Sequence, residues 1–594
     1  MFLAINYYLG LPVSMAHAVF FCICLGLFSW IISRIFHSPW LGVLLFISTL
    51  WYPSFVGESI LRESIYSGQV FLVLACFLAA LFVAPDTPSR FGWGSSAGLA
   101  LGWFWLTREE GIWLLPGVGL LLLAGIAHSW AREKSIRPIV VPVVSASFVF
   151  LCSQLAFAAA NWLAYGSFVG VDIKESAFQA AYSALLGVQD GDHIPRVAVS
   201  RSTREQIYRV SPTFSTLKEY LDQPLGPLKS HFDEGCLHYS YWTCGELRAD
   251  MFLWGLRAAA AFEGHFRSPA TEAEFFRKIA DEVNAGCRSG QLRCGPGWVP
   301  FMPPLSISEL KQIPATIGRS ISWLMLRYPL EGYSPVGPEA PDLLTLNFLN
   351  FPIYAPPSGQ TQYAALEGWY YLRADQWPRI SVVNPRGDLA PFTLLRRVSP
   401  DIEKHFNDSG AGRQRFTIYT ECELNCDLLL EKSTSQLRVK LAEIVEGKHF
   451  FEGSYGQFFI DSAIVRNRTN LGYPSKLSAE IRAVVYRGYQ IVMPVALPMG
   501  IAAFFAAALL SWTTRSNLTE LAISATVWLL LGCRVLLLVL MDVSSSPGLT
   551  SNYLSPALYL SIAAPILSIG SLIKVIALYR GRTLAGYPAQ STAN

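Results

Sequence analysis

Long apolar runs separated by short polar connections dominate both ends of the chain. A helix needs roughly 20 apolar residues to cross a hydrocarbon core about 30 Å thick, and the chain holds about nine such runs. They are residues 13–36, 39–56, 67–85, 92–107, 112–129, 138–163, 488–512, 518–541 and 553–576. The pattern predicts an α-helical polytopic membrane protein, with about nine transmembrane helices divided between an N-terminal membrane region (1–163) and a C-terminal membrane region (488–576).

The pattern between these regions is that of an inserted domain. Residues 164–330 have helical periodicity, with Thr271 and Glu274 as a capping box for a helix that ends at Cys287. An amphipathic segment at 251–266 is expected to pair with that helix as a hairpin.

Prolines crowd residues 331–360, which predicts a linker. Residues 361–465 then alternate apolar and polar positions, as in 415–420 and 436–444, which is typical of a β-sandwich. Residues 466–487 return the chain to the membrane. The insertion is therefore predicted to be an α+β domain.

Basic residues in the connections predict the orientation of the spans, because positively charged loops stay in the cytoplasm. With the N-terminus outside, every odd-numbered connection carries Lys or Arg: Arg34, Arg90, Arg132, Lys134, Arg137, Arg515, Lys574, Arg580 and Arg582. This places the inserted domain outside and the tail (577–594) in the cytoplasm.

Composition agrees with a membrane protein, since 52% of the residues are hydrophobic and only 15% are charged. The net charge of +3 is too small for this length to indicate a nucleic-acid partner. The expected surroundings are a lipid bilayer and, for the inserted domain, an aqueous compartment.

Six of the eleven cysteines fall in the inserted domain as close neighbours, which predicts three local disulfides and an oxidising compartment. The pairs are Cys236 with Cys244, Cys287 with Cys294, and Cys422 with Cys426. A zinc site is the rival for the last pair, but no second pair with matching spacing accompanies it. No metal site is predicted.

Three adjacent charges, Arg108, Glu109 and Glu110, lie between two spans on the predicted outer side. An arginine there can hold a phosphate by paired hydrogen bonds, and a carboxylate can act as a base. The alternative is an ordinary polar turn. Glu58, Arg62 and Glu63 lie on the preceding outer loop, where Glu58 and Arg62 can form a salt bridge one helical turn apart.

Arg534 lies inside an apolar run, where a charge is costly unless it is paired or reaches water. It is a candidate for binding a phosphate, and a structural pair with Asp542 on roughly the same face is the alternative. By contrast, Gly94, Gly98 and Gly102 form a GxxxGxxxG run that helix packing explains fully.

The sequence contains no HExxH or Walker motif, which disfavours zinc proteases and nucleotide-driven pumps. Trp369, Tyr370, Tyr371 and Trp377 offer stacking surfaces for a sugar. Aromatic residues on alternating strand positions are more often core or cross-strand pairs, and we prefer that interpretation.

Three stretches resemble the GT-C superfamily of multispan glycosyltransferases, which use polyprenyl-phosphate sugars on the outer side of the membrane. They are the loop 58–66, the turn 107–111 followed by Trp113 and Pro116, and the late residues Arg534, Asp542, Tyr553 and Pro556. The segment 161–166, at the end of the sixth predicted span, is similar to a family feature as well. The resemblance covers the spans and hardly extends to the inserted domain.

This resemblance implies transfer of a sugar from a polyprenyl-phosphate donor to an acceptor outside a bacterial cytoplasmic membrane. Arg108 and Arg534 would stabilise the leaving phosphate, and Glu58, Glu63 or Glu109 would activate the acceptor hydroxyl. The remaining substrate-binding candidates are Arg62, Glu110, Asp542 and Tyr553. No cofactor is expected beyond the lipid-linked donor, and the need for a divalent metal is open.

The family has an additional first span and a long outer loop that carries a catalytic acidic residue. Residues 1–12 resemble the end of that loop, so we expect either that the sequence starts inside a longer protein or that this acid has been lost. The alternative function is therefore a noncatalytic envelope protein whose outer domain binds a polysaccharide or a protein partner. A transporter is disfavoured, because no pair of broken spans occurs in corresponding halves.

Overall fold

The computed structural model describes most of the chain in two compact units, residues 1–349 with 481–594, and residues 350–480. The described residues are 6, 13–52, 62–108, 110–191, 193–222, 246–295, 305–327, 361–371, 379–387, 392–397, 399–408, 414–420, 425–432, 435–447, 449–453, 456–468, 476–514, 518–545 and 548–585. The predicted linker at 331–360 lies outside them.

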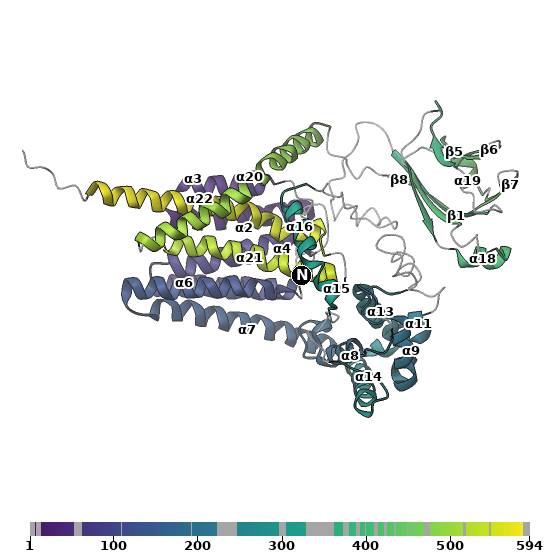
Figure 1. Ribbon diagram of the computed structural model, residues 1–594, viewed down its shortest axis with the longest axis horizontal. Helices are drawn as coiled ribbons and strands as arrows, with labels where there is room; N and C mark the ends of the chain where they lie inside the picture. The colour runs from purple at the N-terminus through teal and green to yellow at the C-terminus, as the bar shows by residue number, and fades with distance from the viewer. Residues whose placement is uncertain are drawn as a thin grey trace, which may run out of the picture. The chain divides into compact units, whose positions relative to one another are not determined.

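The apolar runs form helices that pack around one hydrophobic core (Figure 1). They are α2 (Val13–Phe36), α3 (Pro39–Leu50), α4 (Glu63–Leu78), α5 (Thr87–Thr107), α6 (Leu115–Glu133), α7 (Arg137–Tyr165), α20 (Lys476–Thr514), α21 (Leu518–Ser544) and α22 (Ser551–Ala585). A π-helical turn, Ala79–Val83, continues α4, and a 3₁₀ turn, Gly111–Leu114, precedes α6.

Seven helices of the described part are long and apolar enough to cross a membrane, which supports a multi-pass membrane protein. They correspond to α2, α4, α6, α7, α20, α21 and α22. The other two predicted spans differ. Helix α3 has 12 residues, a length of about 18 Å that is shorter than the hydrocarbon core. Helix α5 has 21 residues but is rich in Gly and Ser.

Helix boundaries at the C-terminal end also differ from the prediction. Helix α20 begins at Lys476 rather than near 488, and α22 continues to Ala585, past the predicted start of the tail at 577. Hydropathy marks only the apolar part of a helix, whereas the backbone hydrogen bonds continue into its polar turns.

The predicted glycine contact joins α5 to α7. A Cβ atom at Gly98 would lie 2.2 Å from the backbone oxygen of Ala146, and one at Gly94 would lie 2.6 Å from the backbone of Pro142. The two helices therefore approach so closely that only hydrogen fits at these positions.

One end of the helices collects the basic residues of the predicted cytoplasmic connections, and we call it the basic end. Arg90 lies 3.6 Å from Glu133, and Lys574 pairs with Glu520 and donates to the backbone oxygen of Ile35 at 3.2 Å. These contacts join the start of α5 to the end of α6, and the last third of α22 to the start of α21 and the end of α2. The opposite end carries Arg108, Glu110 and Arg534, and we call it the Glu110 end.

The region predicted as helical is helical where it is described. It contains α8 (Ser176–Gly187), α9 (Arg201–Val210), α10 (Pro212–Ser215), α11 (Lys218–Asp222), α13 (Ala249–Phe262), α14 (Pro269–Ser289), α15 (Ile307–Leu310), α16 (Ile313–Leu324) and two 3₁₀ turns, Asp172–Lys174 and His265–Arg267. Residues from 177 to 292 share a hydrophobic core of their own, whereas Leu324 and Leu326 belong to the core of the apolar helices.

Helix α14 begins earlier than predicted because Ser268, not Thr271, is its N-cap. The Ser268 side chain accepts from Thr271 N, Pro269 occupies the first turn, and left-handed Gly290 (φ 76°) ends the helix. The expected hairpin with α13 is not its main packing. Helix α14 lies chiefly against α8, where the rings of Phe276 and Phe178 are 4.9 Å apart.

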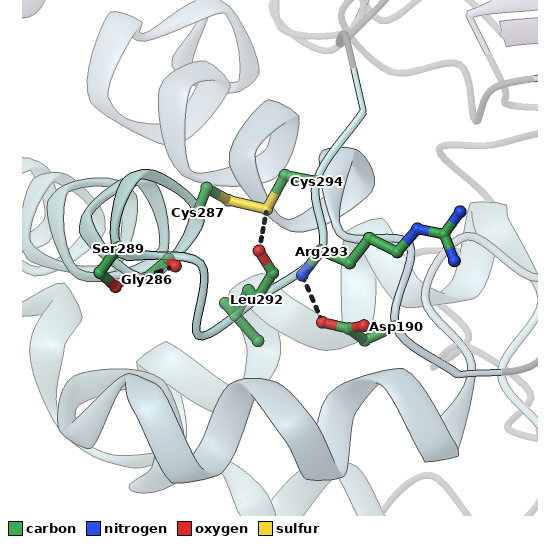
Figure 2. Close-up of a disulfide and its surroundings, with 7 residues drawn as sticks. All are labelled: Asp190, Gly286, Cys287, Ser289, Leu292, Arg293 and Cys294. Carbon is green, nitrogen blue, oxygen red and sulfur yellow. Dashed lines mark hydrogen bonds between the residues drawn. A yellow bond between two sulfur atoms is a disulfide. The ribbon is translucent and has the colours of Figure 1, made fainter.

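The predicted disulfide Cys287–Cys294 is present and closes the end of α14 (Figure 2). Beside it, Asp190 accepts a hydrogen bond of 2.5 Å from Arg293 N. Cys236, Cys244 and Cys422 lie outside the described residues, and Cys426 is buried. Those two predicted pairs stay predictions.

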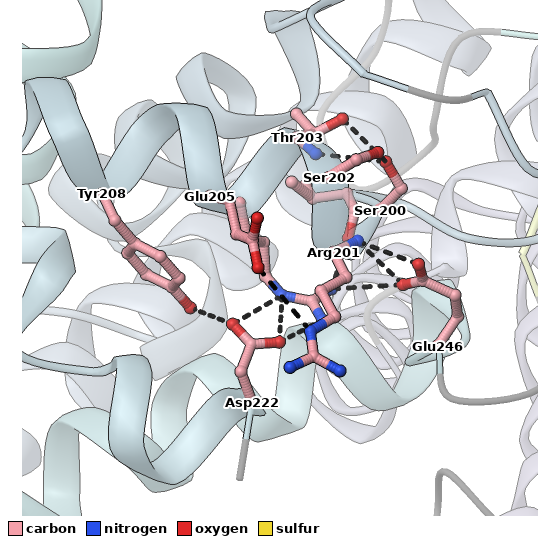
Figure 3. A network of polar contacts seen from close by, with 10 residues as sticks. Ser200, Arg201, Ser202, Thr203, Glu205, Tyr208, Asp222 and Glu246 are labelled. Carbon is pink, nitrogen blue, oxygen red and sulfur yellow. Dashed lines mark hydrogen bonds and ion pairs between the residues drawn. The ribbon is translucent and has the colours of Figure 1, made fainter. Parts of the chain in front are cut away.

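A buried charge network anchors α9 within this helical region (Figure 3). The fully buried Arg204 donates to Asp222 Oδ1 at 3.0 Å from Nε and lies 3.6 Å from Glu246. Tyr208 donates to Asp222, and Arg201 N donates to Glu246 at 2.9 Å. Burial raises the pKa of Glu246, although Arg204 partly opposes this.

The second unit contains two antiparallel sheets with the strand orders β3-β4-β1-β8-β7 and β2-β5-β6. The strands are β1 (Thr361–Tyr371), β2 (Arg379–Val383), β3 (Phe392–Arg397), β4 (Arg415–Thr420), β5 (Asp427–Lys432), β6 (Ser435–Lys440), β7 (Phe450–Gly453) and β8 (Gly456–Arg468), with helices α18 (Pro400–Phe406) and α19 (Leu441–Val445). Both sheets contribute to one core.

The predicted strand at 415–420 is confirmed, and the one at 436–444 is partly wrong. Strand β6 ends at Lys440, and Leu441 and Ile444 bury their side chains from helix α19. Leu441 continues the alternation of Leu437 and Val439, but Ile444 lies three residues further on, a spacing that shares one face of a helix and not of a strand.

The aromatic residues considered for a sugar site are used in packing. Tyr370 is fully buried, Trp369 lies opposite Phe459 with the rings stacked at 5.6 Å, and Tyr371 stacks on Phe406. Trp377 lies outside the described residues. The preferred interpretation is confirmed for Tyr370 in the core and for Trp369 in a cross-strand pair, whereas the ring of Tyr371 packs on helix α18.

Candidate functional site

Charged and aromatic residues from distant parts of the sequence meet at the Glu110 end. Tyr66 comes from the first turns of α4, Arg108 and Glu110 from the connection after α5, and Trp113 from the 3₁₀ turn before α6. Arg534 comes from the middle of α21. We call these five residues, together with Tyr553 near the start of α22, the arginine cluster.

Arg534 is the centre of this cluster and is only 1% exposed. Its Nε and Nη2 atoms donate to the backbone oxygen of Tyr553 at 3.2 and 2.8 Å, and Nη1 lies 3.5 Å from Glu110 Oε1. Nη1 makes no hydrogen bond within the described part of the chain. A buried cation in an apolar helix is costly unless it is paired, and Glu110 is its charge partner here. The Nη1 atom remains without a hydrogen bond among the described residues.

Arg108 binds the same oxygen of Glu110. It is 6% exposed, its Nε atom donates to Glu110 Oε1 at 3.0 Å, and its Nη2 atom also contacts that oxygen. Burial acts to raise the pKa of Glu110, but the guanidinium groups of Arg108 and Arg534 outweigh it and lower the pKa. Two cations on one carboxylate give the trio a net charge of +1.

Aromatic rings form the walls of the arginine cluster. The guanidinium carbon of Arg534 lies 5.7 Å from the ring centre of Tyr66 and 5.5 Å from that of Trp113. The guanidinium carbon of Arg108 lies 5.0 Å from the ring centre of Tyr553. Trp113 Nε1 donates to the Tyr66 hydroxyl at 3.0 Å, which fixes both rings. Such faces stabilise cations that have lost their water.

Asp542 does not belong to this cluster, and the pair with Arg534 that was weighed from the sequence is wrong. Asp542 is buried and binds Arg319 Nη2 at 2.7 Å, with Arg196 Nη2 at 3.6 Å. Both arginines come from the helical region, so Asp542 ties α21 to that region. Residues 534 and 542 are about 80° apart around a helix, and each side chain meets a different neighbour.

The predicted acidic catalytic residues are not located by the structure. Glu58 and Glu109 lie outside the described residues, and of Glu63 only the backbone, at the start of α4, is described. Arg62 is exposed at the N-cap of α4. Among the substrate-binding candidates, the structure brings Arg108, Glu110, Arg534 and Tyr553 together.

Sequence reasoning missed the roles of Tyr66 and Trp113 as walls, and of Arg196 and Arg319 as partners of Asp542. Tyr66 and Trp113 end the two polar outer stretches that carry Arg62 and Arg108, and an aromatic residue shortly after an arginine at the end of a span was a usable signal. Arg196 and Arg319 lie in polar segments where no sequence signal distinguishes them from solvated residues.

No group of three or more His, Cys, Asp or Glu side chains able to hold a metal ion occurs among the residues described. Comparison with family models, with curated proteins and with solved structures gave no match. The geometry of the arginine cluster therefore carries the functional argument.

Proposed function

We propose that this protein is a membrane glycosyltransferase that moves a sugar from a polyprenyl-phosphate donor to an acceptor on the outer side of the membrane. The observation that supports the proposal most strongly is the arrangement of Arg108 and Arg534, two buried guanidinium groups that share one carboxylate. Paired guanidinium groups with a net positive charge suit a phosphate monoester or diester.

In the proposed reaction, an acceptor hydroxyl attacks the anomeric carbon of the donor sugar. The new glycosidic bond forms as the bond from that carbon to the phosphate oxygen breaks, and polyprenyl phosphate leaves with the electron pair. Arg108 and Arg534 stabilise the charge that develops on the phosphate. Glu58, Glu63 or Glu109 takes the hydroxyl proton.

Glu110 has a separate part in this proposal. Its carboxylate occupies the place beside the two arginines that a bound anion would take. Both guanidinium groups are buried from solvent in this arrangement. The donor phosphate would replace Glu110 as the partner of at least one arginine. Before the donor binds, Glu110 keeps the buried positive charges compensated, which limits the cost of holding them in a membrane helix.

The topology that goes with this function is also a proposal. It has nine spans, with α3 and α5 filling the places between the seven longer helices, and the Glu110 end facing outward in a bacterial cytoplasmic membrane. The helical region and a β-sandwich built from the two sheets then lie outside, and the C-terminus lies inside. The basic residues gathered at the opposite end support this orientation.

Transfer from a lipid-linked donor in membranes tests the proposal. Arg108→Ala and Arg534→Ala should each abolish transfer, whereas Arg90→Ala at the basic end should leave it unchanged. Each variant must first appear in the membrane at the wild-type level and elute as a single species in detergent. Unchanged transfer in both site variants would overturn the proposed role of the arginine cluster.

A noncatalytic envelope protein is the second candidate, and one observation favours it. Glu110, the carboxylate that the described site brings to the arginines, is bound by both of them and is not available as a base. This candidate predicts that the wild type binds lipid phosphate without transferring sugar, and that the inserted domain binds a polysaccharide or a protein.

A further inference from the structure

The helices α15 and α16 expose apolar side chains although they follow a polar part of the chain. Ile307 is 73% exposed, Leu310 47%, Ile317 36% and Ile321 43%. An ordinary water-facing surface exposes large apolar residues singly. Here four large aliphatic side chains are exposed within two short neighbouring helices, which makes an apolar patch.

The faces of α16 are reversed relative to those of a helix on a water-soluble protein. It buries Thr316, Ser320 and Leu324, one turn apart, and packs against α21. Ile317 and Ile321, on the adjacent flank, are exposed. The helix keeps its small polar residues inside and presents aliphatic residues outward, as expected where the outer surroundings are not water.

Contacts in the middle of α16 and just past its C-terminal end fix its level relative to the spans. Arg319 binds Asp542, in the last turn of the apolar helix Leu518–Ser544. Just past its C-terminal end, the Leu326 backbone oxygen accepts a hydrogen bond of 2.9 Å from Gln490, near the start of the apolar helix Val484–Thr513. Helix α16 therefore lies across the ends of two spans at the Glu110 end, the depth at which lipid headgroups begin (Figure 1).

The charges around these helices are mainly positive. Lys311 and Arg327 are exposed, Arg319 is exposed but paired with Asp542, and Glu309, the acidic residue of residues 305–327, is buried and caps α15. Exposed basic residues beside an aliphatic face are the composition of a helix that lies in a membrane interface and meets anionic headgroups.

We propose that α15 and α16 form a lipid-docking element that lies in the interface of the leaflet at the Glu110 end, with Ile307, Leu310, Ile317 and Ile321 in contact with phospholipid. The inference is independent of sugar transfer and holds equally for a noncatalytic protein. It makes the bilayer itself, rather than another protein, the partner of this surface.

Site-specific photo-crosslinking in the full-length protein tests this partner. The photo-reactive amino acid p-benzoylphenylalanine replaces Ile317 or Ile321, and the purified protein is reconstituted in vesicles of phosphatidylethanolamine and phosphatidylglycerol. Ala315 is the matched control, because it is exposed on the same helix but about 160° from Ile317 around the axis. Illumination followed by intact-mass spectrometry identifies the adduct.

The expected result is a mass increase of one phospholipid at positions 317 and 321 and its absence at position 315. Crosslinks from 317 and 321 to another segment of this chain or to a second copy would overturn the proposal. So would unmodified protein at both positions, or equal lipid labelling at 315. A variant that elutes as wild type before illumination is folded well enough for each result to count.

Discussion

Replacing Glu110 by Gln should destabilise the protein strongly, because it removes the negative charge between two buried cations. Arg534 is 1% exposed and Arg108 6% exposed, so neither guanidinium group regains water when Glu110 is neutralised. The trio changes from a net charge of +1 to +2. Breaking a buried pair by removing one partner costs about 3–5 kcal/mol, and we expect the lower end because Glu110 is itself 17% exposed.

The matched control is Glu133→Gln at the basic end. Glu133 also faces an arginine, Arg90, at 3.6 Å, but its side chain is 50% exposed, and pairs of that kind contribute about 0–1 kcal/mol. The free energy of unfolding is measured in detergent with SDS as denaturant for both variants. A loss at Glu110→Gln no larger than at Glu133→Gln would refute the electrostatic reasoning.

A double-mutant cycle separates the charge effect from a general disturbance of the turn. Combining Glu110→Gln with Arg534→Met removes one of the two uncompensated cations, so the loss in the double variant should be smaller than the sum of the two single losses by about 0.5–3 kcal/mol. Strictly additive losses would show that Glu110 and Arg534 do not stabilise each other.

Three further predictions concern packing, the disulfide and pH. Gly98→Ala should cost about 1–3 kcal/mol of stability, because its Cβ would lie 2.2 Å from a backbone oxygen of α7. Gly92→Ala, whose Cβ would have no atom within 4 Å, should be neutral or stabilise α5 by about 0.5–1 kcal/mol. The free energies of unfolding of the two variants are compared in detergent. Replacing Cys287 and Cys294 together by Ser should cost about 2–3 kcal/mol for a bridge spanning seven residues, and an unchanged melting temperature would contradict it. Burial raises the pKa of Glu246 in the folded state. The contribution of Glu246 to stability is therefore present at low pH and is lost as pH rises through the folded pKa. Glu246→Gln should gain stability relative to the wild type as pH rises, and a pH-independent difference between the two proteins would contradict this.

The sequence predicted the apolar helices well because a long hydrophobic run leaves few alternatives to a helix in a membrane. It failed where length and tertiary packing matter more than hydropathy. Helix α3 ends at Leu50, where a longer span was predicted, and α16 joins the core of the spans through Leu324 although its own segment is too polar to be predicted as membrane-associated. Hydropathy describes a segment, whereas packing depends on its neighbours.

Arg108, Glu110, Arg534 and Tyr553 of the arginine cluster were predicted as binding residues, but Tyr66, Trp113 and the pairing within the cluster were not. Arg534 and Arg108 stand out because each charge lies beside long apolar runs, which makes an unpaired position costly. Their shared partner, Glu110, could not be assigned, because α21 and the turn after α5 are joined only in the folded structure. Asp542 was the nearer choice in sequence, but Arg319 and Arg196 bind it instead.

Direct binding of polyprenyl phosphate to the purified protein tests the central claim, which is that Arg108 and Arg534 hold a lipid-linked phosphate. Native mass spectrometry of the full-length protein in detergent measures this without knowledge of the sugar or the acceptor. The account predicts one bound polyprenyl phosphate on the wild type and on Arg90→Ala, and its loss on Arg534→Ala and Arg108→Ala. Equal binding by all four proteins would contradict it.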